Sequence, residues 1–398
     1  MTAFLLAMSS LAQADDWPRW QGPDGTGVST EKGWKADLEN TAWKAKLGVG
    51  FSTVSVADGR LFTMGHDGRK SGGKETVWCL DAATGKEIWA DSYEAAIVDY
   101  LHEGGPCATP TVDGKTVYTI SKDGRLNAYW AKTGKIIWSK DMMKAAGMSK
   151  PPPWGFAGSP YVLGQKLIIE TTHTFAIDKE TGKEIWRSKG YRPAYGSPTA
   201  FIHGGRTLIA TLKTDGLVIL DAKDGKTVAF EKWETSYRTN STTPIVRADK
   251  IFVSTGYRRG CALFQLKGDS LAKLYENKKM SNHMNNSILV GDYLYGFDGN
   301  VHMAGPKELV CISFSTGEEQ WRDKSSLQVG SLIVVDNRII ALGQRGEVAI
   351  APVSPKSFSP VAREQVIGGK CWTSPVFANG RLYLRNAKGD LVCLDLRE

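Results

Sequence analysis

Apolar and polar residues alternate along short runs of this chain, and Asp-Gly or Thr-Gly pairs separate the runs. In residues 107–142, four such runs are joined at Asp113-Gly114, Asp123-Gly124 and Thr133-Gly134. Alternation with a period of two predicts half-buried strands. Asp-Gly favours the tight turns that connect antiparallel neighbours. This stretch therefore predicts one four-stranded antiparallel meander.

The four-run unit recurs along the chain. The segment "DAATGKEIW" (81–89) returns almost unchanged as "DKETGKEIW" (178–186), and weaker copies read "WAKTGKIIW", "DAKDGKTVAF" and "SFSTGEEQW". We count eight units of roughly 40 to 50 residues, the size of one propeller blade. The sequence therefore predicts an all-β fold, an eight-bladed β-propeller of four-stranded antiparallel blades.

The last unit stops after its third run, at "LVCLDLRE" (391–398), and lacks the fourth run that carries the tryptophan. A spare run, "NTAWKAKLG" (40–48), stands near the N-terminus and carries Trp43 where the repeat has its tryptophan. We expect this N-terminal strand to complete the last blade and close the ring, which removes the sheet edges that an open array would expose. The propeller domain then covers residues 43–398.

The first residues have the form of a secretory signal. Phe4 to Leu11 are mainly apolar, and Ala12-Gln13-Ala14 matches the small-residue cleavage site. This predicts a signal peptide over residues 1–14 and a periplasmic or secreted protein, although no basic segment precedes the apolar one. No later apolar run is long enough to span a membrane.

Charge and cysteine usage narrow the function classes. The formal net charge is +8, but lysines are spread along the chain without a basic run, so we expect no nucleic-acid binding. The six cysteines show no C-x-x-C spacing. Cys79, Cys311 and Cys393 stand at equivalent places in different units, beyond disulfide reach, so we expect packed free thiols.

The pattern S-x-P-x-V, D-G, L-x-A-L-D-x-x-T-G-K-x-x-W resembles the pyrroloquinoline-quinone (PQQ) repeat over about residues 40–398. In that family the tryptophan docks between neighbouring blades. The resemblance implies this structural role for Trp43, Trp89, Trp138, Trp186 and Trp321. The segment "WPRWQGPDGTGVS" (17–29) is similar to the start of many secreted propellers of this kind. It implies an N-terminal strap over residues 15–42, anchored by Trp17 and Trp20.

Two groups share this repeat, and the fold alone does not separate them. Quinoprotein dehydrogenases hold PQQ and calcium and carry an adjacent cysteine pair, which this chain lacks. The chain is more similar to the BamB-like, non-enzymatic branch. We therefore expect a binding or scaffold module without cofactor, metal or catalytic residues, and a monomer. A PQQ- and calcium-dependent alcohol or sugar dehydrogenase remains the alternative.

A ligand site is expected where the segments that precede the first strand of each blade meet around the axis. We call these the leading segments. They are rich in aromatic, amide, imidazole and charged side chains, which suits a pocket for a protein, peptide or glycan of the cell envelope, but also a water-filled mouth. The candidates are His102, Glu103, Trp154, Tyr191, Arg192, Tyr195, Arg238, Asn240, His283, Asn285, Asn286, Gln328, Lys370 and Trp372.

Overall fold

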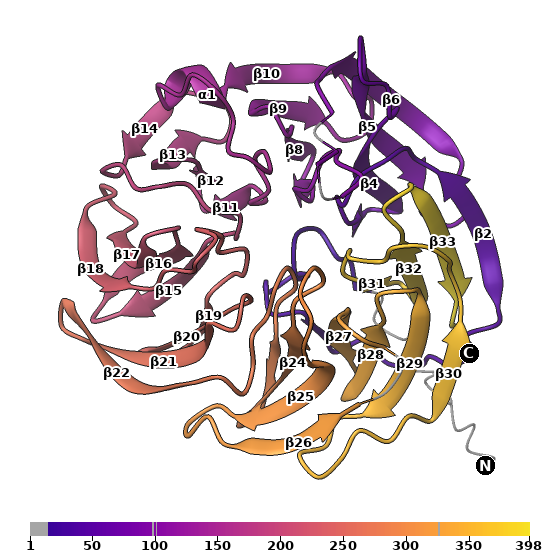
Figure 1. The fold of residues 1–398 in the computed structure, drawn as a ribbon. Helices are drawn as coiled ribbons and strands as arrows, with labels where there is room; N and C mark the ends of the chain where they lie inside the picture. Colours follow the sequence, from indigo (N-terminus) through magenta and orange to yellow (C-terminus); the bar gives the residue numbers. More distant parts are fainter. Residues whose placement is uncertain (1–14, 98, 101, 325–326) are drawn as a thin grey trace, which may run out of the picture.

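The computed structural model describes residues 15–97, 99–100, 102–324 and 327–398. The predicted signal peptide, residues 1–14, lies outside the described residues. Within these ranges the strands form eight sheets arranged around one axis (Figure 1). Neighbouring strands of each blade run antiparallel, and the predicted eight-bladed β-propeller is confirmed. No helix of the described ranges is long and apolar enough to cross a bilayer.

The first four blades follow each other along the chain, each with its first strand nearest the axis (Figure 1). Blade 1 contains β3 (Ser55–Ala57), β4 (Arg60–His66), β5 (Lys74–Asp81) and β6 (Glu87–Glu94). Blade 2 contains β7 (Thr111–Asp113), β8 (Thr116–Ile120), β9 (Arg125–Trp130) and β10 (Ile136–Asp141), followed by helix α1 (Met142–Ala145). Blade 3 contains β11 (Tyr161–Leu163), β12 (Lys166–Glu170), β13 (Thr174–Asp178) and β14 (Glu184–Arg187). Blade 4 contains β15 (Thr199–His203), β16 (Arg206–Leu212), β17 (Gly216–Asp221) and β18 (Thr227–Lys232).

The remaining blades complete the circle and include two N-terminal strands. Blade 5 contains β19 (Ile245–Arg247), β20 (Lys250–Thr255), β21 (Gly260–Lys267) and β22 (Ser270–Asn277). Blade 6 contains β23 (Ile288–Val290), β24 (Tyr293–Gly299), β25 (Lys307–Ser313) and β26 (Glu319–Asp323). Blade 7 contains β27 (Ser331–Val335), β28 (Arg338–Leu342), β29 (Glu347–Pro352) and β30 (Ala362–Gln365), with β1 (Val28–Ser29) parallel to β27. Blade 8 contains β31 (Val376–Ala378), β32 (Arg381–Arg385), β33 (Asp390–Asp395) and β2 (Thr41–Lys46).

The ring closes as predicted. Strand β2 pairs antiparallel with β33 and places Trp43 opposite Cys393. The equivalent pairs in other blades are Trp89 with Cys79 and Trp321 with Cys311. The three cysteines therefore occupy one register position of the repeat, and they are free thiols.

The hydrophobic core lies between successive blades. One buried cluster joins blades 1 and 2 and another joins blades 2 and 3. The repeat tryptophan spans this gap, because the Trp89 indole N–H donates to the carbonyl oxygen of Ala131 in the next blade, at 2.9 Å. The same contact is made by Trp43 to Ala82, Trp138 to Lys179, Trp186 to Ala222 and Trp321 to Ser354.

The N-terminal segment crosses the channel at the end where the first strands finish. Trp17 exchanges main-chain hydrogen bonds with Val56 of β3, at 2.8 and 2.9 Å, and Pro18 accepts from Val112 of β7. Further along, β1 pairs with the end of β27, and Trp34 packs against Phe377 of blade 8. Figure 1 shows this dark segment in the central opening. The segment therefore links four consecutive blades, 7, 8, 1 and 2, across the point where the ring closes.

Candidate functional site

Hydrogen bonds between neighbouring blades hold the first strands in place around the axis. Several first strands begin directly after a proline, whose missing N–H costs nothing on the innermost, unpaired edge of a sheet. The proline carbonyls accept hydrogen bonds from hydroxyls of the preceding blade. Thr111 donates to Pro160 at 2.6 Å and Thr199 to Pro244 at 2.9 Å. Each donor directly follows the proline of its own blade, so this contact ties the start of one first strand to the start of the next.

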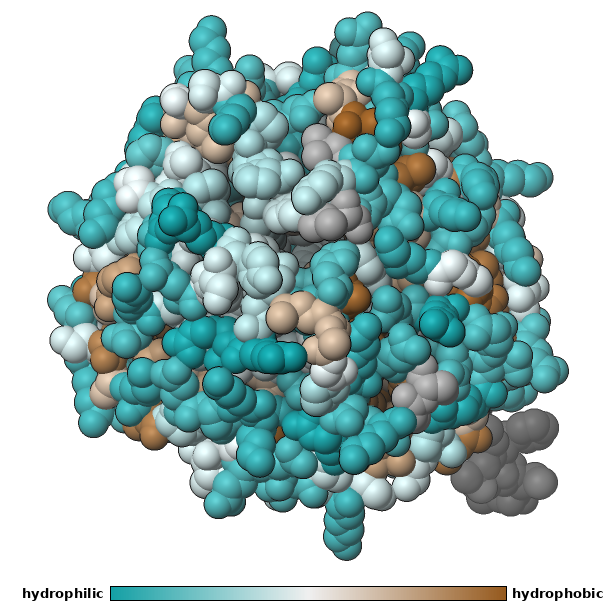
Figure 2. All heavy atoms as spheres, viewed as in Figure 1, coloured by the Kyte–Doolittle hydropathy of each residue, from teal (hydrophilic) through white to brown (hydrophobic). Residues whose placement is uncertain are grey.

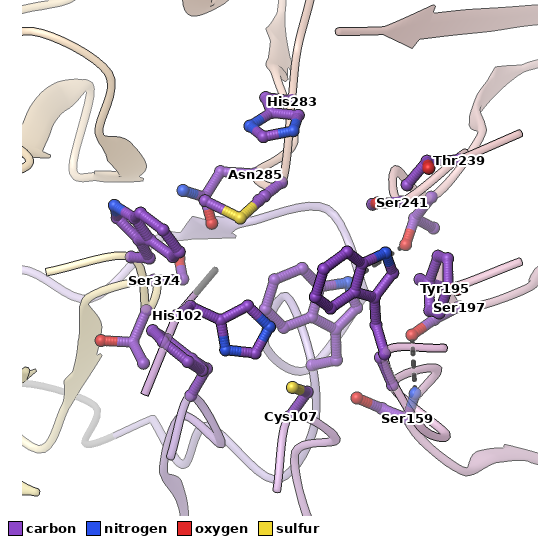
Figure 3. A pocket seen from close by; sticks show the side chains of 18 of the residues that line it. His102, Cys107, Ser159, Tyr195, Ser197, Thr239, Ser241, His283, Asn285 and Ser374 are labelled. Carbon is purple, nitrogen blue, oxygen red and sulfur yellow. Dashed lines mark hydrogen bonds between the residues drawn. The ribbon is translucent and has the colours of Figure 1, made fainter. Parts of the chain in front are cut away.

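The leading segments surround a cavity of about 170 Å³ on the axis. It opens on the face opposite the N-terminal segment and is seen as a hollow in Figure 2. Trp20 of the N-terminal segment lines the cavity and donates its indole N–H to Thr243 at 3.1 Å. The lining residues are Trp20, Phe51, His102, Cys107, Trp154, Ala157, Ser159, Tyr195, Ser197, Thr239, Ser241, Thr243, Tyr257, His283, Met284, Asn285, His302, Trp372, Thr373 and Ser374 (Figure 3).

Aromatic rings follow each other around the mouth of this cavity. Each ring contacts the next, with successive centroids 4.7 to 6.3 Å apart. We call this row the aromatic collar. Among the described residues it consists, in order, of Tyr237, Tyr257, His283, His302, Trp372, Phe51, His102, Trp154 and Tyr100.

Polar groups of the lining are uncharged and face the cavity from several blades. The Nδ1 atom of His102 accepts the main-chain N–H of Gly104 at 2.9 Å, so the neutral ring carries its proton on Nε2. Asn285 donates its amide group to the carbonyl oxygen of Gly330, at 3.0 Å, and retains an acceptor oxygen. Ser159 and Ser197 accept main-chain N–H groups of the preceding blades and keep their own O–H groups as donors.

Burial keeps the cavity imidazoles neutral. It lowers the pKa of His102 to about 4, with further lowering by the charges of Lys122 and Lys370. Burial also lowers the pKa of His283 to about 3, with a smaller effect from His302. The lining carries no Asp, Glu, Lys or Arg among the described residues. At neutral pH the cavity is therefore an uncharged site.

Six of the predicted site residues line this cavity. They come from the leading segments of blades 2, 3, 4, 6 and 8. Figure 3 labels four of them in place around the cavity: His102, Tyr195, His283 and Asn285. The six are His102, Trp154, Tyr195, His283, Asn285 and Trp372.

The charged candidates do not line the cavity, and three of them are held in ion pairs. Glu103 pairs with Lys370 at 2.8 Å, and the Lys370 ammonium lies 4.4 Å from the ring centre of Trp372. Arg192 pairs with Asp215 and Glu234. The exposed Arg238 is absent from the lining as well, and its backbone has a positive φ of 54°.

The other polar candidates have structural contacts instead. Asn240 donates to the carbonyl oxygens of Lys213 and Trp233, at 2.7 and 2.9 Å. Asn286 exchanges two hydrogen bonds with the main chain of Thr243. Tyr191 shares a hydrogen bond with Thr227 and stacks on Phe230, both on the perimeter strand β18. Gln328 likewise lies outside the cavity lining.

Several cavity residues were not among the predicted site residues. Phe51 and Cys107 stand in leading segments, so their position was available from the repeat. Tyr257 and His302 come from the loops β20–β21 and β24–β25, which no leading segment includes. Trp20 was expected only as an anchor of the N-terminal strap.

The donor set of this site does not suit a calcium-bound quinone. Calcium takes six to eight oxygen ligands, usually with carboxylates among them, and the described lining holds no carboxylate. PQQ is itself a polycarboxylate, and the lining offers no arginine or lysine to pair with it. Within the described ranges, no cluster of three or more His, Cys, Asp or Glu residues could hold a metal ion.

Sequence comparison relates the chain to two kinds of propeller. A family model described as "Outer membrane protein assembly factor BamB" matches residues 28–152, 73–323 and 175–398. The chain is 24% identical over 345 residues to BamB of Shewanella oneidensis, covering 81% of this chain and 78% of that protein. It is 32% identical over 169 residues to quinohemoprotein alcohol dehydrogenase ADH IIB of Pseudomonas putida. That match covers 39% of this chain and 21% of the dehydrogenase, so the chain spans about a fifth of that relative's length.

Solved structures of both kinds share the fold. The crystal structure of BamB from Moraxella catarrhalis superposes with a TM-score of 0.63 at 17% identity, covering 90% of this chain and 98% of that chain. Quinohemoprotein alcohol dehydrogenase from Comamonas testosteroni gives a TM-score of 0.66 at 13% identity, covering 98% of this chain and 82% of that chain. At these identities the likeness concerns the fold alone.

Proposed function

Because the chain belongs to the PQQ-like β-propeller family described by the outer membrane assembly factor BamB, we propose that it is a binding module of the cell envelope. Its axial cavity holds the ligand, and the blades act as a rigid frame. The observation that carries this proposal is the cavity itself. Aromatic rings and uncharged polar groups from different blades converge on one mouth, and Trp20 lines it from the strap.

The construction of the cavity favours ligand binding over a merely hydrated channel. Ligand sites are mostly apolar and contain a few polar groups that fix orientation. Here the aromatic collar supplies the apolar area, while His102 and Asn285 supply a donor and an acceptor. Inter-blade hydrogen bonds hold the leading segments, so the site is largely formed before a ligand arrives.

A quinoprotein dehydrogenase is the alternative suggested by the dehydrogenase relatives. The uncharged lining argues against it, because both the calcium ion and the carboxylates of the quinone lack partners there. We therefore assign no catalytic residue and no redox step. Export to the periplasm or beyond is part of the proposal, since it follows from the predicted signal peptide and from the BamB relatives.

Site-specific photo-crosslinking in the native host tests the proposal. A photo-reactive phenylalanine analogue is placed at Tyr100 or Tyr237, which are 71% and 62% exposed at the mouth. The same analogue at Ile202, which is 74% exposed in β15, is the matched control. We expect adducts from positions 100 and 237 and none from 202. Adducts from 202 alone, or none from the mouth, would overturn the cavity as the binding site.

A further inference from the structure

The lining chemistry indicates what kind of ligand the cavity takes. We infer that the aromatic collar and the cavity bind a neutral glycan, with one sugar ring inside the cavity and further sugars stacked along the collar. This inference rests on the proposed binding function and adds the chemical class of the ligand. It is carried by three independent features: ring faces, uncharged hydrogen-bonding groups and the size of the cavity.

Aromatic faces around the mouth suit the apolar faces of pyranose rings. Trp372 and Phe51 stack with an interplanar angle of 20° and a centroid distance of 5.4 Å. On the other side of His102 in the collar, Tyr100 stacks on Trp154 with an angle of 12°. Large flat side chains bury much apolar area with little loss of conformational entropy. Trp372 itself is buried in its pair, so the ring faces available to a sugar belong to the partly buried Phe51 and Trp154 and to the exposed Tyr100.

Hydrogen-bonding groups between these rings match hydroxyl groups in both directions. The His102 Nε2–H donates, the Asn285 side-chain oxygen accepts, and the Ser159 and Ser197 hydroxyls do either. Figure 3 shows these labelled side chains around one space. A sugar hydroxyl is both donor and acceptor, so sugar hydroxyls can pair with all of these side chains. A purely apolar ligand would leave the same donors and acceptors without hydrogen-bond partners.

Charge separates a neutral glycan from other ligands that aromatic rings bind. A quaternary ammonium ion would use the ring faces, but the ammonium groups of Lys122 and Lys370 lower the pKa of His102 by more than the Glu103 carboxylate raises it, so the nearby charges oppose a cation. An acidic ligand would want arginine or lysine in the lining, and the described lining has neither. Lys370 is also already paired with Glu103.

The dimensions favour insertion of one ring. The cavity of about 170 Å³ lies below the roughly 300 to 1,000 Å³ of pockets that enclose a whole drug-sized ligand. A longer ligand must therefore extend out of the mouth. Tyr100 and Tyr237 lie at the mouth with most of their surface exposed to solvent. They are placed to contact the second or third sugar.

A glycan array followed by calorimetry tests this inference. The purified protein is applied to an array of neutral and acidic oligosaccharides, and hits are titrated as free trisaccharides. We expect saturable binding of the neutral oligosaccharides. Trp154→Ala should raise the Kd about tenfold, which is the loss of affinity expected when one stacking ring is removed. Tyr100→Ala, a surface change, should weaken trisaccharides and leave a monosaccharide unaffected. Trp130→Ala, which removes a 45% exposed ring of β9, is the control.

The outcomes separate this inference from the proposed function. Absence of binding to every neutral glycan, or binding that Trp154→Ala and Tyr100→Ala leave unchanged, would overturn the glycan assignment. If choline or an aromatic peptide bound instead, with loss in Trp154→Ala, the cavity would remain a binding site for another ligand class. If no glycan bound and the crosslinks from positions 100 and 237 were also absent, both the glycan assignment and the proposed binding function would be wrong.

Discussion

The indole ring of Trp89 in blade 1 covers Gly134 of blade 2, so closely that a Cβ on this glycine would lie 2.6 Å from the ring. Gly134 also has a φ of +70°, in the Thr-Gly turn of the repeat. The glycine is therefore needed both for its backbone conformation and for the space above it. The same relationship joins Trp43 to Gly85, Trp138 to Gly182 and Trp186 to Gly225.

Replacing Gly134 by alanine tests this contact. The Cβ would force the Trp89 ring away from the turn, and this overpacking should lower the free energy of unfolding by about 1–3 kcal/mol. The positive φ should cost roughly 1 kcal/mol more, because alanine is disfavoured in that conformation. Gly114→Ala is the matched control, because Gly114 has a φ of +56° with nothing within 4 Å of its Cβ. Denaturant unfolding should show a larger loss for Gly134→Ala, and equal losses would contradict the docking role.

Ring closure depends on Trp43. Its indole N–H donates to Ala82 of blade 1 while its strand pairs with β33. Trp43→Ala should lower the free energy of unfolding by about 3 kcal/mol, because a partly buried aromatic ring and a hydrogen bond are lost at the seam. Trp130→Ala is again the control and should cost under about 1 kcal/mol. Deletion of residues 1–47 should destabilise more than Trp43→Ala, and an unchanged thermal midpoint would contradict closure by β2.

The strap introduces a pH-dependent contact at blade 8. The Glu31 carboxylate accepts the main-chain N–H groups of Asn379 and Gly380. Burial nevertheless raises the pKa of Glu31 from 4.5 to about 7. In β5 of blade 1, burial raises the pKa of Glu75 to about 7 as well. A folded-state pKa above the unfolded value means stability that is present at low pH and lost as pH rises.

The contributions of Glu31 and Glu75 to the free energy of unfolding should therefore fall as pH rises from about 4.5 to about 7. Those of His102 and His283, whose pKa values burial lowers, have the opposite sign, so the test is the difference between each variant and the parent protein. Glu31→Gln should shift the slope by the Glu31 contribution, and adding Glu75→Gln should remove that of Glu75. Glu87→Gln, an exposed substitution on β6, should leave the slope as in the parent protein. A slope that Glu31→Gln does not change would show that the Glu31 carboxyl is not held as described.

The sequence predicted the ring well, because its determinants are local. Alternating runs, turn glycines and the repeat tryptophan each act over a few residues, and they placed Trp43 beside β33 correctly. The leading segments also led to His102, Trp154 and Trp372, since position before a first strand determines proximity to the axis. The repeat thus predicted which of these residues line the axial cavity as well as how the blades are built.

The remaining parts of the site depend on contacts between distant residues. Nothing in the spacing indicates that Arg192 pairs with Asp215 and so does not line the cavity. Likewise, Tyr257 and His302 reach the cavity from loops that precede the third strand of their blades. Trp20 reaches it from the strap, on the other side of the ring.

Ligand affinity should be independent of pH over the range in which the cavity is uncharged. The pKa of His102 is about 4 and that of His283 about 3, and burial also lowers the pKa of His302. The other charges that act on these imidazoles belong to Lys122, Lys307 and the Glu103–Lys370 pair. Fluorescence titration should give a constant Kd from about pH 8 to about pH 5, where histidine ordinarily titrates. Weakening is expected as pH falls through about 4. A several-fold change between pH 8 and 6 would indicate a charged contact.

We propose that the axial cavity is an uncharged ligand site and holds no quinone. Paired calorimetric titrations of the same protein test it, one with PQQ and excess calcium and one with the neutral trisaccharide bound best on the array. We expect saturable heat with the trisaccharide, lost or much weakened in Trp154→Ala, and no heat of binding with PQQ and calcium. Stoichiometric PQQ binding that Trp154→Ala abolishes would contradict it and return the chain to the quinoproteins.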